Sequence, residues 1–314
     1  MAGTVISAHN PMTGPRHLGH YASTMASWPR LAAEGQLIVV IDDLIAALLY
    51  PKGRNDLELR TLSAVREFMA LEIDFGNHHI VLTSMVPEVH ELAFFVTLHL
   101  DEAWCRKLYR ESFAGILSSY QRAEIGLPSL PSVAEVVYPQ CHLAALTLGL
   151  GADYFQGGEE MLGYMHIMEE IARKVPVLRP PKFIAGARFV LGTDGNHMGA
   201  ENAIYVSAPR EQIQAQVAGV TDVEVFANWA SALRDTDNFK QFGPDSLNAA
   251  AVPIKELRAQ VGGALVAELE KFSAHKLRQG DMVAVLERSS AFAREKLNAC
   301  LTSIKRELKI TGFA

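Results

Sequence analysis

The stretch LIVVIDD, residues 37–43, decides the fold of this 314-residue chain. Its five consecutive apolar residues, followed by two carboxylates, predict a strand that is buried on both faces. The runs TVISA (4–8) and HHIVLTS (78–84) predict two further strands, and helical patterns over 21–31 and 56–71 separate the three. This alternation of strands and helices predicts an α/β fold with a doubly wound parallel sheet.

Polar residues follow each of these strands. TGPRHLGH (13–20) comes after the first, Asp42 and Asp43 end the second, and Thr83 and Ser84 end the third. Ligands of such sheets bind beyond the carboxyl ends of the strands, so topology alone predicts a site here. We expect Asp43 to cap the helix that begins at Leu44 and Asp42 to face the pocket.

The remainder of the chain is mainly helical. We expect helices over most of 87–125, a helix with a short strand-like step and a glycine turn over 138–161, and a helix over 162–174. A strand and a glycine-rich loop are predicted over 188–204, and helices after about residue 211. These patterns predict two domains, a nucleotide- and substrate-binding domain over 1–190 and an all-α domain with the loop over 191–314.

Composition narrows the class of protein. Hydrophobic residues make up 49% and charged residues 20%, as in an ordinary globular protein, and the net charge of −6 argues against a dedicated nucleic-acid coat. A local basic patch would still suffice for tRNA. The three cysteines lack CxxC spacing, and no signal peptide or membrane span is visible. We therefore expect a cytoplasmic protein without a structural metal site.

The tetrapeptide His17-Leu18-Gly19-His20 carries the strongest chemical signal. Two imidazoles three residues apart at a helix start can both face a bound polyphosphate, and Gly19 leaves room for a nucleoside. The alternative is a histidine-rich turn without chemistry, and the four residues alone do not decide between the two.

The neighbouring residues decide it by resemblance. TGPRHLGHY resembles the HIGH signature of class I aminoacyl-tRNA synthetases, in the form typical of tryptophanyl enzymes. Four further segments resemble that family in the same order along nearly the whole chain: SMVPEVHEL (84–92), YPQCHLAAL (138–146), FQGGEEM (155–161) and VLGTDGNHMGAENAI (190–204).

The resemblance implies a Rossmann-type catalytic domain, a helical anticodon-binding domain and a homodimer. It also implies a reaction in which a carboxylate attacks the α-phosphate of Mg²⁺-bound ATP, and the acyl group then passes to tRNA. By family role, His17 and His20 stabilise the reacting phosphate. The implied ATP-binding residues are Thr13, Gly14, Gly19, Gly158, Gly192, Asp194 and Met198. The implied substrate-binding residues are Asp42, Tyr138, His142, Ala145 and Met161, and no metal-binding side chain is implied.

The loop over 190–204 departs from the family. Where the family has KMSKS, this chain has His197-Met198-Gly199-Ala200-Glu201, without a lysine and about two residues short. A unit charge ~4 Å from a phosphate is worth roughly 4 kcal/mol at an effective dielectric of about 20. We therefore expect slow adenylation unless Lys52, Arg54 or Arg16 supplies the missing charge; Lys52 and Arg54 could equally be solvated loop residues.

The substrate pocket departs as well. The family aspartate that accepts the indole N–H corresponds to Ala145, its methionine to His142, and the glutamine of GEDQ to Met161. An indole without its acceptor would lose about 1–3 kcal/mol. His142 is either a new polar specificity residue or a core histidine, and Met161 either contacts substrate or packs.

Three hypotheses about function remain open. The leading one is an ATP-dependent enzyme that activates an amino acid other than tryptophan and delivers it to tRNA or to another acceptor, as in specialised metabolism. The second is an ordinary tryptophan–tRNA ligase with a divergent loop. The third is a catalytically weak paralogue that binds a ligand or tRNA.

Overall fold

The computed structural model describes residues 3–13, 15–111, 117–158, 161–186, 189–242, 252–274 and 277–309. Gly14, one of the expected ATP-binding residues, lies outside these ranges.

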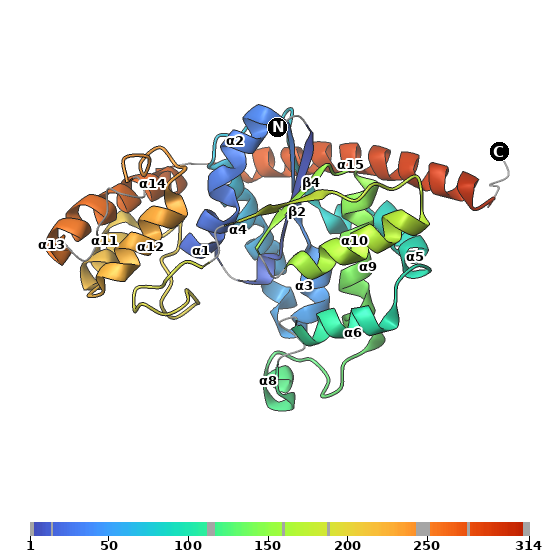
Figure 1. The fold of residues 1–314 in the computed structure, drawn as a ribbon, viewed down its shortest axis with the longest axis horizontal. Coiled ribbons are helices and arrows are strands. Elements are labelled where there is room, and N and C mark those ends of the chain that lie inside the picture. Colours follow the sequence, from blue (N-terminus) through green and yellow to red (C-terminus); the bar gives the residue numbers. More distant parts are fainter. Residues whose placement is uncertain are drawn as a thin grey trace.

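A parallel sheet of five strands forms the centre of the molecule (Figure 1). The strand order is β3-β2-β1-β4-β5, so the chain winds in one direction from β1 to β3 and then returns to the other side of β1. Such a reversal between β1 and β4 opens a crevice at the carboxyl ends of these two strands. The bounds are β1 (Thr4–His9), β2 (Gln36–Ile41), β3 (His79–Leu82), β4 (Tyr154–Gly157) and β5 (Lys182–Ala185).

The first three predicted strands are confirmed, and the fifth is a correction. We predicted a strand from residue 188, whereas β5 lies at Lys182–Ala185 and residues 189–191 lead into a hairpin. β5 is a short edge strand whose four residues are half-buried or exposed. It lacks the continuous apolar run that marks buried strands, and this is why the sequence pattern missed it.

Alternating side chains of the strands fill two separate cores. Leu37, Val39 and Ile41 of β2 point to one face and belong to a cluster with Trp28 and Phe68. Ile38 and Val40 point to the other face and belong to a second cluster. Since both faces are covered, β2 is fully buried from Leu37 to Ile41, as its composition predicts.

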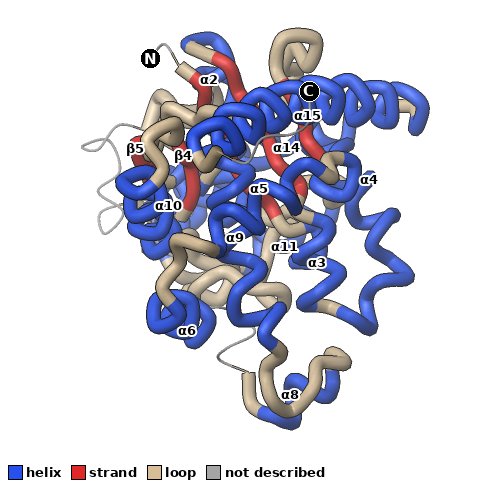
Figure 2. The backbone as a smooth tube through the Cα atoms, turned by 90° about the vertical axis from the view of Figure 1, so that its right-hand side faces the viewer, coloured by secondary structure: helices blue, strands red, loops and turns tan. Residues whose placement is uncertain are grey.

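Helices cover both faces of the sheet (Figure 2). The expected helix over 21–31 is divided at Thr24, whose hydroxyl donates to His20 O. The helices of the first 174 residues are α1 (Leu18–Ser23), α2 (Trp28–Glu34), α3 (Asp43–Leu49), α4 (Leu57–Met69), α5 (Glu88–Thr97), α6 (Glu102–Glu111), α8 (Ser119–Glu124), α9 (Val133–Gly149) and α10 (Leu162–Lys174), with short 3-10 turns at Pro11–Thr13, Met25–Ser27, Pro51–Asp56 and Thr83–Met85.

After residue 209 the described chain is mainly helical, and most of these helices form a lobe beside the sheet (Figure 1). They are α11 (Arg210–Gly219), α12 (Val223–Leu233), α13 (Ile254–Leu257), a π-helical turn (Arg258–Gly262), α14 (Gly263–Ala274) and α15 (Gln279–Glu307). The last of these, α15, leaves the lobe and returns across the sheet. Ser289 of α15 accepts a hydrogen bond from Ile80 N of β3 at 3.0 Å. The domain division at residue 190 stays a prediction.

Among the described helices, none is both long enough and apolar enough to cross a membrane.

Candidate active site

The two imidazoles of HLGH cap the helix that they begin. His17 is the N-cap of α1, and its Nδ1 accepts a hydrogen bond from Gly19 N at 3.1 Å. The Nδ1 of His20 accepts from His17 N at 3.3 Å, which completes a reciprocal capping box. A ring nitrogen that accepts carries no proton, so the proton of each neutral imidazole lies on Nε2. Each ring therefore keeps an Nε2–H to donate to another group.

Both imidazoles are held neutral. Burial, with help from the charge of Arg16, lowers the pKa of His17 to about 4 and that of His20 to about 2. The rings stack with centroids 3.8 Å apart. A second proton on either ring would occupy the Nδ1 that caps the helix. At neutral pH the pair is thus a double hydrogen-bond donor rather than a pair of cations.

Gly19 lies between these rings and residues 190–202, which form the second motif of the site. A Cβ at Gly19 would lie 2.8 Å from the His17 ring and 3.9 Å from Met198 Sδ. Met198 is itself only 3% exposed and packs in the core. The glycine is therefore required by close packing of the capping imidazole, in addition to the room that the family assigns to the nucleoside.

The HLGH segment is tied directly to the chain that follows the second motif. Leu18 N donates to Ile204 O at 2.8 Å, and Val206 N donates to Arg16 O at 2.9 Å. These bonds place residues 204–206 alongside the start of α1. The structure thus brings together two motifs that lie more than 170 residues apart in the sequence.

The second motif is a closed hairpin. Leu191 bridges His197, Gly192 N donates to Asn196 O at 2.7 Å, and Met198 N donates to Val190 O at 3.0 Å. The side chain of Asn202 closes the other side of the hairpin.

The amide of Asn202 donates to Asp194 Oδ1 at 2.7 Å, and its oxygen accepts from Gly199 N at 2.7 Å. A Cβ at Gly192 would lie 2.2 Å from this amide, so Gly192 is needed for closure.

The hairpin is anchored to α12 of the helical lobe. Asn228 accepts from Leu191 N at 2.8 Å, and Trp229 Nε1 donates to Leu191 O at 2.8 Å. The chain carries no lysine or arginine between residues 189 and 209. The loop keeps its shape through glycine and asparagine contacts but offers no positive charge.

The three candidate replacement cations differ in placement. Lys52 Nζ donates to the carbonyls of Ala123 and Glu124 at 2.9 and 2.8 Å, and Arg54 Nε donates to Ala47 O at 2.8 Å, so both hold nearby loops. Arg16 is 1% exposed, and its charge lowers the pKa of His17 and His20. Of the three, Arg16 is the one whose field acts on the imidazoles.

α1 is also hydrogen-bonded to the helical lobe through the side chain of Tyr21. Tyr21, next to His20, donates to Glu268 of α14, a carboxylate only 3% exposed. Asn238 and Lys271 each donate to Glu268 at 2.6 Å. Burial and this carboxylate raise the pKa of Tyr21 far above its ordinary value. The network fixes the orientation of the helix that carries His20.

The two carboxylates after β2 differ from our expectation in one role, the cap of α3. Asp42, not Asp43, is the N-cap of α3, and its Oδ1 accepts from Ile45 N at 3.3 Å. Asp43 is buried and accepts from Thr83 Oγ1 at 2.8 Å and Ser84 N at 2.9 Å. The cap assignment to Asp43 was therefore wrong. Asp42 still turns its other oxygen, Oδ2, toward His142 Nδ1 at 3.2 Å.

Four aromatic side chains surround Asp42. His142 and Tyr138 of α9 have ring centroids 5.3 Å apart, and His90 of α5 hydrogen-bonds the hydroxyl of Tyr138. Burial and then the charge of Asp42 raise the pKa of Tyr138 and of Tyr164 to about 12.

His90 and Tyr164 were absent from the predicted site. The sequence held one hint of His90, because it lies within the VPEVHEL resemblance.

The other residues that we expected at the site lie on α9 or follow the strands β4 and β1. Ala145 is fully buried on α9, one helical turn after His142. Met161 precedes α10, and its side chain packs against Gly157. A Cβ added at Gly157 would lie 2.7 Å from Met161 Cγ. Gly158 O accepts from Met161 N at 3.0 Å, so Gly158 shapes this turn. Thr13 ends the 3-10 turn that follows β1.

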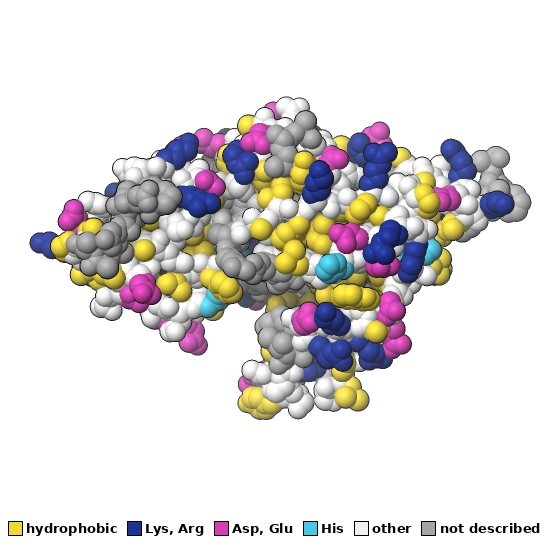
Figure 3. Space-filling view, in the orientation of Figure 1, with side chains coloured by type: hydrophobic (Ala, Val, Ile, Leu, Met, Phe, Trp, Pro, Cys, Tyr) yellow, Lys and Arg dark blue, Asp and Glu magenta, His cyan; other side chains and the backbone are white. Residues whose placement is uncertain are grey.

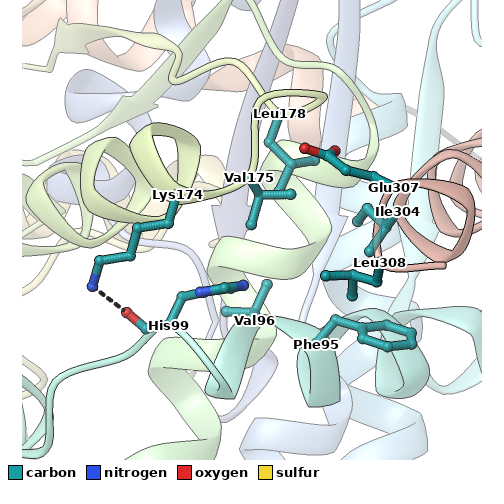
Figure 4. Close-up of a pocket in the computed structure, with 9 residues that line it drawn as sticks. All are labelled: Phe95, Val96, His99, Lys174, Val175, Leu178, Ile304, Glu307 and Leu308. Atoms are coloured by element: carbon teal, nitrogen blue, oxygen red, sulfur yellow. Dashed lines mark hydrogen bonds between the residues drawn. The ribbon is translucent and has the colours of Figure 1, made fainter. Parts of the chain in front are cut away.

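Two surface features elsewhere offer less. The cavity near the end of α15, between Phe95, Val175 and Leu308, has a volume of about 30 Å³, room for little more than a water molecule (Figure 4). On the face in Figure 3, Lys and Arg side chains alternate with Asp and Glu rather than forming one basic surface. Among the described residues, no group of three His, Cys, Asp or Glu could hold a metal.

Comparison with known proteins agrees with this fold. No protein-family model matches the chain. The tryptophan–tRNA ligase of Treponema pallidum is 26% identical over 98% of this chain and 97% of its own length. The tryptophanyl-tRNA synthetase of Mycoplasma pneumoniae superposes with a TM-score of 0.79, at 16% identity and 99% coverage of both chains. That of Campylobacter jejuni, solved with ADP and tryptophan, gives 0.74, at 17% identity and 98% and 99% coverage.

The fold is therefore that of the class I aminoacyl-tRNA synthetases, as the motifs indicated. Within this class, the chain is similar along its whole length to tryptophan–tRNA ligases, which are aminoacyl-tRNA ligases.

Proposed function

We propose that this protein activates an amino acid with ATP, forming an aminoacyl-adenylate and pyrophosphate, and transfers the acyl group to tRNA or another acceptor. The observation that carries the proposal is the capped pair His17 and His20, whose two Nε2–H groups remain available as donors beside the sheet crevice. Donors fixed before the reaction stabilise charge that develops on a phosphate without reorganising.

The chemistry needs no covalent nucleophile on the protein. The carboxylate of the acid attacks the α-phosphate, the bond to the β-phosphate oxygen breaks, and pyrophosphate leaves with the electron pair. His17 and His20 would donate to the phosphate oxygens, and the hairpin around Gly192, Asp194 and Met198 would cover the nucleotide. Positioning supplies the rest of the rate.

Mg²⁺ would reach this site on the nucleotide. The described residues contain no cluster of three ligating side chains, so phosphate oxygens, which are hard ligands of the kind Mg²⁺ prefers, would hold it. The ion would neutralise phosphate charge, and the protein would contribute the hydrogen-bond donors.

The finer part of the proposal is that tryptophan is not the selected acid. Ala145 stands where the family has the indole acceptor, and its methyl group is fully buried and cannot accept a hydrogen bond. Met161 stands where the family has glutamine and packs over Gly157. Both changes remove polar contacts that a tryptophan substrate would need.

Pyrophosphate exchange over a panel of amino acids and related carboxylic acids tests the proposal. Exchange with an acid other than tryptophan is expected. Exchange with tryptophan alone would mean an ordinary tryptophan–tRNA ligase and would reject the specificity proposal. Charging of bulk tRNA with the same acid tests the acceptor, and absence of acylated tRNA would point to another acceptor.

The hairpin favours a second candidate function. Because residues 189–209 provide no cation for the phosphates, the chain could bind ATP or tRNA without turning over. No exchange with any acid, together with ATP binding in calorimetry, would support this binding protein and reject the enzyme.

We also propose that the protein is a homodimer. Phe94 of α5, Leu98 directly after it and Val133 of α9 are 61%, 60% and 79% exposed, an unusual apolar exposure on neighbouring helices. A second copy would cover this surface. Phe94→Asp is expected to convert a dimer to a monomer in analytical ultracentrifugation; an unchanged mass would exclude this surface as the interface.

A further inference from the structure

His142 is completely buried, yet only one of its two ring nitrogens has a partner. Nδ1 lies 3.2 Å from Asp42 Oδ2, whereas Nε2 is buried and meets no hydrogen-bonding group among the described residues. A buried polar atom left unpaired costs about 1–3 kcal/mol. Such an atom at the carboxyl end of a parallel sheet is placed where ligands of this fold bind.

Asp42 fixes which nitrogen of His142 carries the proton. Its Oδ1 accepts from Ile45 N, which leaves Oδ2 turned toward the imidazole. An ionised carboxylate only accepts hydrogen bonds, so the proton of the neutral imidazole lies on Nδ1. Nε2 then presents a lone pair and acts as an acceptor.

We propose that the pair Asp42–His142 recognises the side chain of the activated acid, with Nε2 of His142 accepting a hydrogen bond from an N–H or O–H group. This inference rests on the proposed adenylation and names its substrate class: acids whose side chain carries a hydrogen-bond donor. This acceptor lies at a different place on α9 from the one that Ala145 lacks. His142 lies three residues before Ala145 on α9, which corresponds to a shift of roughly 4.5 Å along the helix axis.

Tyr138 and His90 lie beside the ring that carries this nitrogen. Their rings lie 5.3 and 5.9 Å from the His142 ring, and they are hydrogen-bonded to each other. Tyr138 is half-buried and His90 is exposed, so both can turn without disturbing the core. A side chain that enters from the crevice would displace this pair and satisfy Nε2.

Matched substrates test the inference. Tryptophan with benzothienylalanine, and tyrosine with phenylalanine, differ by one donor at nearly constant shape. The wild type should prefer the donor-bearing member of at least one pair by about tenfold or more, as one buried hydrogen bond allows. His142→Met should remove the preference.

Two further variants separate recognition from packing. Asp42→Asn keeps an oxygen for Ile45 N but turns an amide N–H toward His142, which moves the imidazole proton to Nε2 and should also remove the preference. Thr147→Val removes another buried, unpartnered polar atom of α9 and should leave the preference unchanged.

Each variant is measured by pyrophosphate exchange and by the thermal shift that each acid produces. If the wild type shows no exchange, the proposed function is rejected. If its thermal shifts still show a preference for the donor-bearing acid, and His142→Met removes that preference, the inference is supported. A donor preference that survives in His142→Met by either readout would overturn the inference. Equal treatment of both members of every pair by the wild type would overturn it as well.

Discussion

The two motifs that meet above the sheet are held in shape by different means, and they differ in what they offer a nucleotide. The start of α1 uses its own functional side chains as structural elements, because the Nδ1 atoms of His17 and His20 cap the helix. The hairpin over 190–202 is closed by Asn202 and Gly192, and it provides no cation. Substitution of His17 or His20 therefore removes a helix cap together with a hydrogen-bond donor. The hairpin, in contrast, keeps its shape without a charged side chain that could bind phosphate.

The first expected consequence is a pH effect confined to the imidazoles. Burial lowers the pKa of His9 to about 3, of His17 and His79 to about 4, and of His20 to about 2, from an ordinary value of 6.5. Below pH 6.5 the unfolded chain binds protons that the folded chain excludes. The free energy of unfolding should therefore fall steadily from pH 7 to pH 4.

Urea unfolding at pH 7.5, 6 and 5 measures this fall. It is the largest effect expected here, because four imidazoles contribute in the same direction. Constant stability over that interval would mean that the imidazoles are not buried as described.

Substitution of His20 should have the largest effect on turnover. His20→Ala removes one prepositioned donor, so we expect kcat of pyrophosphate exchange to fall about 10²–10³-fold with little change in the KM for ATP. His79→Gln, at the amino end of β3, is the matched control and should keep its kcat. Equal kcat in the two variants would exclude a catalytic role for His20.

The network beneath α1 should matter for stability. Glu268→Ala leaves the hydroxyl of Tyr21 and the amide of Asn238 without their shared acceptor and should lower the free energy of unfolding by about 3 kcal/mol. Glu270→Ala, on the same helix, breaks only the exposed pair with Arg210 and should cost about 0.5 kcal/mol. Similar losses in urea titrations of both variants would contradict a buried network.

Opening the hairpin should have a moderate effect. Asn202→Ala removes the bonds to Asp194, His197 and Gly199, so we expect the KM for ATP to rise about tenfold, equivalent to roughly 1.4 kcal/mol. Asn196→Ala removes one side-chain bond and should change the KM less. An unchanged KM in Asn202→Ala would show that closure of the hairpin is not needed for ATP.

Restoring charge to the hairpin should give the smallest change, and a gain. At ~10 Å from a phosphate and an effective dielectric of about 20, a unit charge contributes roughly 1.7 kcal/mol before screening. Glu201→Lys should raise the exchange rate several-fold, and Glu201→Gln less. A rate that falls in Glu201→Lys would mean that the site already holds enough positive charge.

The sequence predicted the parts of the site that depend on local patterns. The strand over 37–41 follows from five consecutive apolar residues, and the positions of His17 and His20 at a helix start follow from the polar segment after a strand. The similarity to class I synthetases, read from five segments, is confirmed by the comparisons. The ATP- and substrate-binding roles of individual residues stay predictions.

The failures depend on contacts between distant segments. Asp42 and Asp43 are adjacent and chemically identical, and what separates them is the segment after β3, where Ser84 N donates to Asp43 whereas Asp42 caps α3. Tyr164 joins the site only because α10 packs beside α9. Local propensity cannot report such pairings, which depend on tertiary packing.

The long helix α15 has a mechanical consequence. Its 29 residues span roughly 43 Å, and it is a member of both cores: Met282 and Leu286 belong to the cluster shared with the lobe, whereas Leu297 and Ile304 belong to the cluster behind the sheet. A lobe that swings about a flexible linker could move freely. Here any movement of the lobe must bend α15 or shift it along β3. Motions of the lobe are therefore transmitted to the strand that leads into Thr83 and Ser84, which bond Asp43.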